Sequence, residues 1–336
     1  MFKQRKNWRK LVTALALLVL TFQSAYAENP QPRKIYSGWI PYYGMKTSLP
    51  AALNNADLIR EVMPFWYTFK YNGKNASIQD LYSPANPSVP IAQPLSAMRN
   101  AGFTIIPTIT DGTEKLILAN LLATENGRIA SVKVINDLVM QNNFDGIDLD
   151  FEGFAFVDGA NSWDKTKPNW VAFVKLLSET LKANGKLLSM TTPYLLDPAS
   201  GKRGYYVYAW AEIAPFIDRL RIMTYDFSVA RPGPIGPIGW TEDTIKYAVS
   251  IMPASKVFVG LAGYGRDWVT RVTGVCPADV AKTVSTSAKA ATFLMRNAQT
   301  LAAGYGATIS YNENFQEATF TYQKTYNGNT ATGLAT

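Results

Sequence analysis

The chain has 336 residues, with no histidine and a single cysteine, Cys276. The absence of histidine excludes Ser-His-Asp triads, HExxH zinc sites and other histidine-metal centres. One cysteine excludes an intrachain disulfide and cysteine-clustered zinc or iron–sulfur sites. Any catalysis must therefore use carboxylates, tyrosine, lysine, hydroxyls or backbone groups, although the formal net charge is +8.

Residues 1–27 have the features of a secretory signal peptide. Five basic residues are followed by an apolar run at 11–22, and Ala25-Tyr26-Ala27 places small residues where signal peptidase reads them. We expect cleavage before Glu28 and a secreted, extracytoplasmic protein. An uncleaved anchor is the alternative, which the short apolar run disfavours. Without the five basic residues the net charge falls to +3, and nothing resembles the basic face of a nucleic-acid-binding protein.

After residue 34, short β-rich apolar runs alternate with longer helical patterns. The predicted strands are 35–44, 61–71, 103–110, 144–153, 186–195, 219–227 and 256–265. The predicted helices include 115–143, 169–185 and 241–252, from apolar residues at three- and four-residue spacing. This alternation implies parallel strands with right-handed crossovers.

An open doubly wound sheet and a closed (β/α)8 TIM barrel both fit the alternation. No G-x-G-x-x-G follows the first strand, which disfavours a dinucleotide-binding fold, so the α/β barrel is preferred. The repeat GPIGPIG at 233–239 is predicted to be a stiff loop after the sixth strand. We expect residues 34–336 to form a single catalytic domain.

The segment FDGIDLDFEG at 144–153 places acids among apolar residues. In a strand, alternate side chains share a face, so Asp148, Asp150 and Glu152 point one way, above Gly146. The apolar residues between them point the other way, towards covering helices. Asp145 falls on this apolar face and is predicted to be structural.

Neighbouring carboxylates in a partly desolvated cavity cannot all ionise at a low cost in free energy. Repulsion and desolvation raise the pKa of at least one of them, and we expect a protonated Glu152 that acts as a general acid. Glycoside cleavage requires such an acid. The alternatives are a calcium site, disfavoured because calcium loops are polar and glycine-turned, and a structural ion-pair cluster.

Two motifs and several segments together resemble glycoside hydrolase family 18, the chitinase family. Asp145, Asp148, Asp150 and Glu152 match its D-x-x-D-x-D-x-E signature, and residues 223–226 match its Met-x-Tyr-Asp motif on the sixth strand. GWIPYYG, PFWYTF, GYGRDW and the stretch 301–322 are similar to the branch that includes spore-cortex peptidoglycan hydrolases.

This resemblance implies a retaining, substrate-assisted mechanism. Glu152 would protonate the glycosidic oxygen while the substrate's N-acetyl carbonyl attacks the anomeric carbon. Asp150 would orient the acetamido group, Asp148 would tune Asp150, and Tyr225 would hydrogen-bond the acetamido carbonyl. Asp226 would contact the sugar.

Further candidate sugar contacts are less specific. Met223 belongs to the sixth-strand motif, and Trp240, Tyr264 and Trp268 lie where strands or loops end. These aromatic side chains are suited to stacking on sugars, with ordinary packing as the alternative.

The sequence departs from the family pattern in two places. The S-x-G-G motif of the third strand is replaced by the segment 108–112, TITDG. An eighth strand with a tryptophan is also not recognisable, because the last tryptophan is Trp268. We therefore expect a barrel that lacks its final βα unit.

The sequence predicts a monomeric, secreted glycosidase without a metal or cofactor. Its substrate would be a GlcNAc-containing glycan, with peptidoglycan slightly favoured over chitin by the branch resemblance. A non-hydrolytic, lectin-like relative and an inactive fragment remain as alternatives. We expect no nucleic-acid partner and no membrane attachment after signal cleavage.

Overall fold

The structure is a computed structural model that describes residues 36–326 and 329–335. The expected signal peptide, residues 1–27, lies outside the described residues. Residues from Ser37 onward belong to one structural unit. None of the helices in the described ranges is long and apolar enough to cross a membrane.

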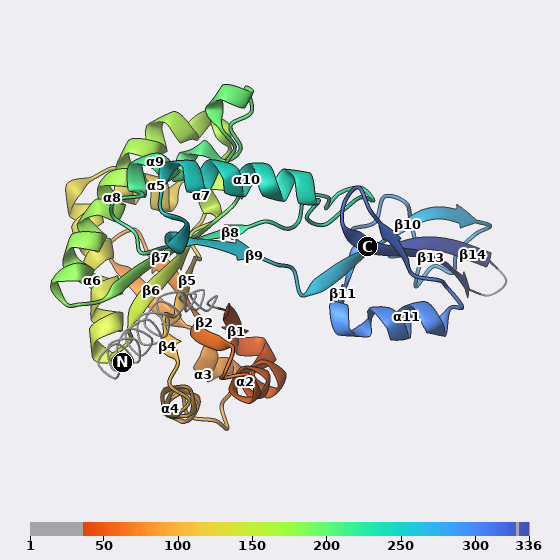
Figure 1. Ribbon diagram of the computed structural model, residues 1–336, viewed down its shortest axis with the longest axis horizontal. Helices are drawn as coiled ribbons and strands as arrows, with labels where there is room; N and C mark the ends of the chain where they lie inside the picture. Colours follow the sequence, from red (N-terminus) through yellow and green to blue (C-terminus); the bar gives the residue numbers. More distant parts are fainter. Residues whose placement is uncertain (1–35, 327–328, 336) are drawn as a thin grey trace, which may run out of the picture. The chain divides into compact units, whose positions relative to one another are not determined.

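A curled, mainly parallel sheet forms the centre of this unit (Figure 1). Its main path is β1 (Tyr36–Pro41), β2 (Ile59–Tyr71), β5 (Thr108–Asp111), β6 (Gly146–Asp150), β7 (Leu187–Thr192), β8 (Arg219–Met223) and β9 (Val257–Gly260). Two short strands, β3 (Ala76–Asp80) and β4 (Thr104–Ile105), pair with β2 outside this path. The pairs from β2 to β9 along the path are parallel, as in a (β/α)8 barrel.

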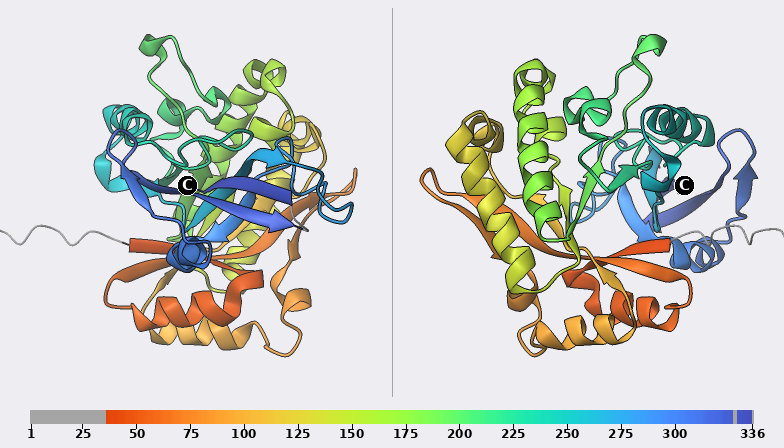
Figure 2. Two further views of the ribbon diagram at one scale, coloured as in Figure 1. Left: turned by 90° about the vertical axis from the view of Figure 1, so that its right-hand side faces the viewer. Right: turned by 60° about the vertical axis from the view of Figure 1, so that its left-hand side comes forward.

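Helices connect and cover these strands. They are α2 (Met45–Asn54), α3 (Tyr82–Ala85), α4 (Ala92–Asn100), α5 (Ile117–Leu122), α6 (Glu125–Gln141), α7 (Gly153–Phe156), α8 (Trp163–Ala183), α9 (Trp210–Ile213) and α10 (Ile238–Ile251). Figure 2 shows the two longest, α6 in yellow and α8 in green, along the outer side of the strands. The predicted α/β barrel arrangement is therefore confirmed.

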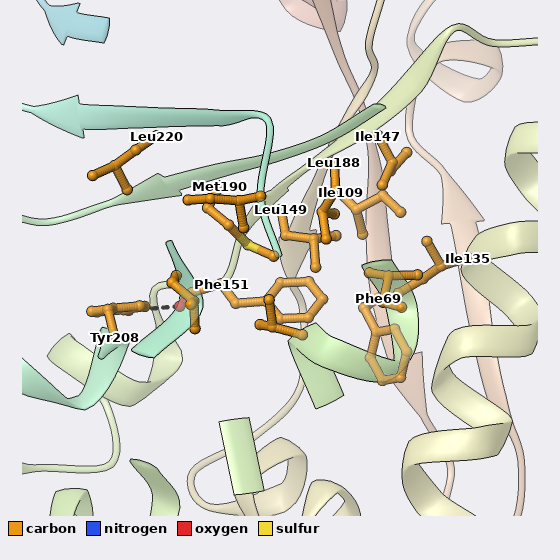
Figure 3. Close-up of a cluster of buried hydrophobic side chains, with 14 of the residues drawn as sticks. Phe69, Ile109, Ile135, Ile147, Leu149, Phe151, Leu188, Met190, Tyr208 and Leu220 are labelled. Atoms are coloured by element: carbon orange, nitrogen blue, oxygen red, sulfur yellow. Dashed lines mark hydrogen bonds between the residues drawn. The ribbon is translucent and has the colours of Figure 1, made fainter. Parts of the chain in front are cut away.

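The layer between the sheet and its helices is the main hydrophobic core. Ile147, Leu149 and Phe151 are almost fully buried in it, and the Phe151 ring contacts Trp170 and Phe173 of α8. Figure 3 shows these side chains of the acidic segment among apolar residues of neighbouring strands. Burial of this face fixes the register of β6, since a one-residue slip would put acids into the core.

The sheet has two open edges within the described ranges. They are β1 and β9, and no strand there joins one to the other. Seven strand positions of the barrel are thus occupied in the described residues.

After β9 the chain forms a second, antiparallel sheet. Its order is β11 (Ala291–Leu294), β10 (Tyr264–Thr273), β14 (Asn329–Ala335), β13 (Glu317–Tyr326) and β12 (Ser310–Asn312), accompanied by α11 (Ala298–Gly304). Glu317 connects this second sheet to the loop that precedes α10. It accepts hydrogen bonds from the N–H groups of Ile235 (2.8 Å) and Gly236 (2.5 Å). Long-range contacts of this kind have no local sequence signal.

Several predicted elements have different limits in the structure. The single strand at 103–110 is divided into β4 and β5, separated by Ile106 and Pro107, because proline has no N–H for a strand ladder. The helix at 115–143 is divided into α5 and α6, because the Thr124 side chain caps α6 by accepting from Gly127 N–H. The predicted strand 256–265 ends at Gly260.

Candidate active site

Asp148 is fully buried at the centre of a group of hydroxyls. Thr108 of β5 donates to its Oδ2 at 2.9 Å, and Ser189 of β7 donates to its Oδ1 at 2.6 Å. Thr191 lies within 3.1 Å of both carboxylate oxygens. Hydroxyls from β5 and β7 thus satisfy both oxygens of this buried carboxylate.

A buried arginine lies beneath this carboxylate. Arg221 of β8 donates from Nε to Ser189 at 3.0 Å, and the same nitrogen lies 3.9 Å from Asp148. Its Nη2 donates to Glu61 of β2 at 2.6 Å, and its Nη1 donates to Ser37 at 2.8 Å. The inside of the curled sheet therefore contains an ionic network that links β1, β2, β6, β7 and β8.

Asp150 and Glu152 lie above Asp148, and each of the two affects the pKa of the other. Burial raises the pKa of Asp150 well above its usual range, and the charges of Glu152 and Asp148 raise it further. Burial also raises the pKa of Glu152, a hydrogen bond from Asp150 lowers it, and the charge of Asp226 raises it. Both carboxyls therefore have a raised pKa, with burial as the largest cause in each.

The raised pKa of Glu152 has the direction expected of a general acid, and the pKa of Asp150 is raised as well. Asp150 is the more deeply buried carboxyl of the two, and its Oδ1 has no hydrogen-bond partner among the described residues. Desolvation acts most strongly on such a group. Glu152 lies nearer the cavity, at the position where β6 gives way to α7.

A cavity of about 900 Å³ opens at this end of the strands. Its lining contains seven of the residues predicted from the sequence: Asp150, Glu152, Met223, Tyr225, Asp226, Trp240 and Tyr264. The remaining three lie elsewhere. Asp148 is beneath the cavity, Asp145 accepts from the N–H of Ile105 at 2.7 Å, and Gly146 packs so closely on Leu187 that a Cβ would clash with its carbonyl oxygen.

Tyr225 and Asp226 follow β8 and face the acid pair. Burial, followed by the charge of Asp150, raises the pKa of Tyr225, so its phenol remains a hydrogen-bond donor. Asp226 has a positive φ of 59°. Its Oδ1 accepts from Tyr264 at 2.7 Å and from Arg266 Nε at 3.0 Å, and Arg266 Nη2 forms an ion pair with it at 2.7 Å, which fixes the carboxylate at the cavity wall.

Trp240 lies in the first turn of α10 and not at the end of the preceding loop. The GPIGPIG segment enters the helix at Ile238, after Pro237 at the N-cap. The indole of Trp240 contacts the rings of Tyr194 (4.9 Å between centroids) and Phe227 (5.3 Å). Trp268, in contrast, is buried and donates to the Val229 carbonyl, so it packs within the protein.

Sequence reasoning missed most of the aromatic lining. Its unpredicted members are Trp39, Tyr43, Phe65, Phe156, Tyr194, Tyr205 and Phe227. Trp39 and Phe65 lie within β1 and β2, whereas the other five lie in the segments that follow strands of the curled sheet. For these five, a position after the carboxyl end of a barrel strand is the signal that could have identified them. The described residues contain no group of three or more histidine, cysteine, aspartate or glutamate side chains placed to hold a metal.

Comparisons with known proteins agree with this geometry. The family model described as Glycosyl hydrolases family 18 matches residues 36–332. The Bacillus subtilis protein YdhD, whose name describes a sporulation-specific glycosylase, is 28% identical over 222 residues, which cover 65% of this chain and 47% of YdhD. Chitinase A1 of Niallia circulans is 30% identical over 156 residues, or 39% of this chain and 22% of that enzyme. The chain thus spans less than half the length of these curated relatives.

Solved structures show the same fold. A chitinase from Chromobacterium violaceum superposes with a TM-score of 0.69 at 22% identity, covering 89% of this chain and 85% of that structure. The spore cortex-lytic enzyme SleL of Bacillus megaterium gives a TM-score of 0.68 at 19% identity, with coverage of 90% and 64%. Because the family model covers most of the sequence, and the acids of its signature line one cavity or support it, this chain belongs to glycosyl hydrolase family 18.

Proposed function

We propose that this chain is a retaining glycosidase that cleaves β-1,4 bonds next to an N-acetylglucosamine residue. The observation that carries the proposal is the coupled Asp150–Glu152 pair, which faces Tyr225 across one cavity. A carboxyl whose pKa is raised by burial can deliver a proton near neutral pH. Glu152, on the cavity side of the pair, is the group placed to do so.

In the first step, the Glu152 proton goes to the glycosidic oxygen as the bond from that oxygen to the anomeric carbon breaks. The acetamido carbonyl oxygen of the substrate forms the new bond to the anomeric carbon, which gives an oxazolinium ion and leaves Glu152 ionised. This substrate-assisted route is an established exception to the scheme with two enzyme carboxylates. The leaving sugar carries the proton away.

In the second step, water attacks the anomeric carbon from the side the leaving group has vacated. Its proton goes to Glu152, the oxazolinium bond breaks, and the acetamido group is restored. Asp150 orients the acetamido N–H, and the Tyr225 phenol donates to the acetamido oxygen. Two successive inversions retain the configuration at the anomeric carbon.

The charge of the cavity lining supports a neutral sugar at the reacting position. The described lining residues include Asp150, Glu152 and Asp226 but no lysine or arginine. This lining offers no cationic side chain to pair with the lactyl carboxylate of muramic acid. We therefore propose that a GlcNAc residue of chitin or of peptidoglycan binds there. We also propose that the enzyme is a monomer and that residues 1–27 direct its secretion.

The test compares the wild-type chain with Glu152→Gln on chito-oligosaccharides and on purified peptidoglycan. Product release by the wild type and its loss in Glu152→Gln support the proposal. Sugar binding without release by the wild type would instead support the lectin-like alternative. Edman sequencing of the exported protein tests secretion, with Glu28 as the expected first residue, and size-exclusion chromatography tests the monomer.

A further inference from the structure

The acid Glu152 lies on a short segment that the strand ladder no longer supports. The last paired residues of β6 are Asp150, opposite Thr110, and Leu149, opposite Met190. The carbonyl of Phe151 lies beyond both registers, and this carbonyl shares its peptide plane with the N–H of Glu152. A buried carbonyl without a hydrogen-bond partner costs free energy. The group that bonds the Phe151 carbonyl therefore affects the position of Glu152.

That partner is the hydroxyl of a distant tyrosine. Tyr208 donates from its hydroxyl to the Phe151 carbonyl at 2.6 Å, as the dashed line in Figure 3 shows. Tyr208 ends a short 3₁₀ turn in the connection after β7, 57 residues further along the chain, and it is almost completely buried. The N–H of Ala155 donates to the Glu152 carbonyl at 3.1 Å. Backbone hydrogen bonds therefore hold the chain on both sides of the Glu152 side chain.

Tyr208 is itself fixed by neighbouring groups. The indole of Trp170 on α8 donates to the Tyr208 carbonyl at 3.2 Å, and its ring meets the Tyr208 ring at 87°. Phe154, two residues after the acid, contacts both rings. The segment that carries Glu152 is thus attached to α8 and to the connection after β7.

We propose that Tyr208 is a positioning residue for the proposed hydrolysis: its hydroxyl fixes the Phe151–Glu152 peptide so that the Glu152 carboxyl meets Asp150 in the cavity. Tyr208 does not line the cavity and acts through the backbone alone. This inference rests on the proposed function, because it concerns how the acid of that reaction is oriented. Catalytic rates depend steeply on such orientation, by about 100-fold for a displacement of about 1 Å.

The experiment compares Tyr208→Phe with Tyr82→Phe. Tyr82 is a matched control: it is fully buried and donates to the backbone carbonyl of Val89 at 3.0 Å, which does not belong to the segment that carries Glu152. Both variants lose one buried hydroxyl bond and should lose a similar free energy of unfolding. Only Tyr208→Phe should lower kcat, by about 10- to 100-fold, with KM within about twofold of the wild type.

The pH profile of kcat gives a second test, because a purely structural role of Tyr208 would leave it unchanged. The charged or titratable groups around Glu152 and Tyr208 are Asp111 on β5, Asp150 on β6, Asp226 after β8, and the phenols of Tyr208 and Tyr225. A displaced Glu152 changes its coupling to Asp150, so the apparent pKa values of kcat should shift in Tyr208→Phe and stay unchanged in Tyr82→Phe. Equal kcat and equal pH profiles in the two variants would overturn the inference.

A second variant decides the question if Tyr208→Phe does not fold. Trp170→Phe removes the indole N–H that fixes the Tyr208 carbonyl and leaves the hydroxyl bond in place. It should lower kcat and shift the pH profile in the same direction but to a smaller extent, and an unchanged kcat and profile would contradict the inference. A wild-type chain that releases no product would overturn the proposed function and this inference together, whereas an active wild type with an unaffected Tyr208→Phe overturns this inference alone.

Discussion

Thr108 donates its hydroxyl to Asp148 across the β5–β6 pair, at 2.9 Å, where the two residues are directly in register. Thr108 begins the segment that stands in place of the family's S-x-G-G motif. The third strand therefore still supplies a hydroxyl to the central carboxylate. Asp148 in turn raises the pKa of Asp150 by its charge, so Thr108 influences the acid pair indirectly.

Replacing Thr108 by valine keeps the shape of the side chain and removes this donor. We expect kcat to fall several-fold, because Asp148 loses one of its three hydroxyl partners, and the free energy of unfolding to fall by about 1–3 kcal/mol. Urea unfolding and steady-state kinetics measure both effects. Thr180→Val is the control: its hydroxyl bonds the backbone carbonyl of Leu176 within α8, and its loss should leave kcat unchanged.

Asp150→Asn should reduce activity and stabilise the protein near neutral pH. The folded-state pKa of Asp150 is raised by burial and neighbouring charge, whereas in the unfolded chain aspartate ionises near about 3.9. As pH rises from the unfolded to the folded pKa, only the unfolded state releases the proton, so the wild type loses stability in this window. Asparagine does not ionise and avoids the loss.

The measurement for Asp150→Asn is urea unfolding from about pH 4 to pH 7. The variant's stability advantage should be smallest at the acidic end and increase with pH. An advantage that shrinks as pH rises would mean that the folded-state pKa of Asp150 is lowered, in conflict with its burial beside Asp148 and Glu152.

The buried network of Glu61 should be far more sensitive than an exposed ion pair. Glu61 is almost fully buried and pairs with both Arg219 and Arg221. Glu61→Gln therefore removes the carboxylate partner of Arg219 and leaves Arg221 with Asp148 at 3.9 Å. Loss of one partner of a buried pair costs about 3–5 kcal/mol. Glu242→Gln, which breaks the exposed Lys246–Glu242 pair, should cost no more than about 0.5 kcal/mol. Equal losses in urea unfolding would contradict the structural role given to Glu61.

Trp240→Ala should weaken substrate binding more than it slows the chemical step. The indole lies in the cavity lining beside Tyr194 and Phe227, and aromatic contacts are worth about 0.5–1.5 kcal/mol. We expect KM to rise by up to about 10-fold with kcat little changed, measured on chito-oligosaccharides. An unchanged KM would show that Trp240 only packs against neighbouring side chains and does not contact the substrate.

The part of the site that can be predicted from the sequence is the part in which residue types alternate regularly. In β6, apolar and acidic residues alternate over 146–150, which predicts a strand with two different faces. The side chains of Asp148 and Asp150 could therefore be placed from the sequence, whereas Glu152 follows the strand at the N-cap of α7. The position of Trp240 was misjudged because proline and glycine before it indicated a loop, whereas a proline can directly precede a helix.

The unpredicted part depends on contacts between segments far apart in the chain. Tyr208 reaches Phe151 from 57 positions away, and Arg221 reaches Glu61 from 160 positions away. Such pairs follow from how the strands curl, and no local pattern encodes them. The same holds for the raised pKa values of Asp150 and Glu152, which depend on how deeply each carboxyl is buried.

The central claim is that Glu152 is the proton donor in a glycosidase. Glu152→Gln keeps the size of the side chain and removes the acid, so the fold should persist. The most direct measurement is the release of reducing ends from chito-oligosaccharides by this variant and by the wild type, with circular dichroism of both. The account predicts release by the wild type and none by a folded Glu152→Gln. Release at an undiminished rate by the folded variant would contradict it.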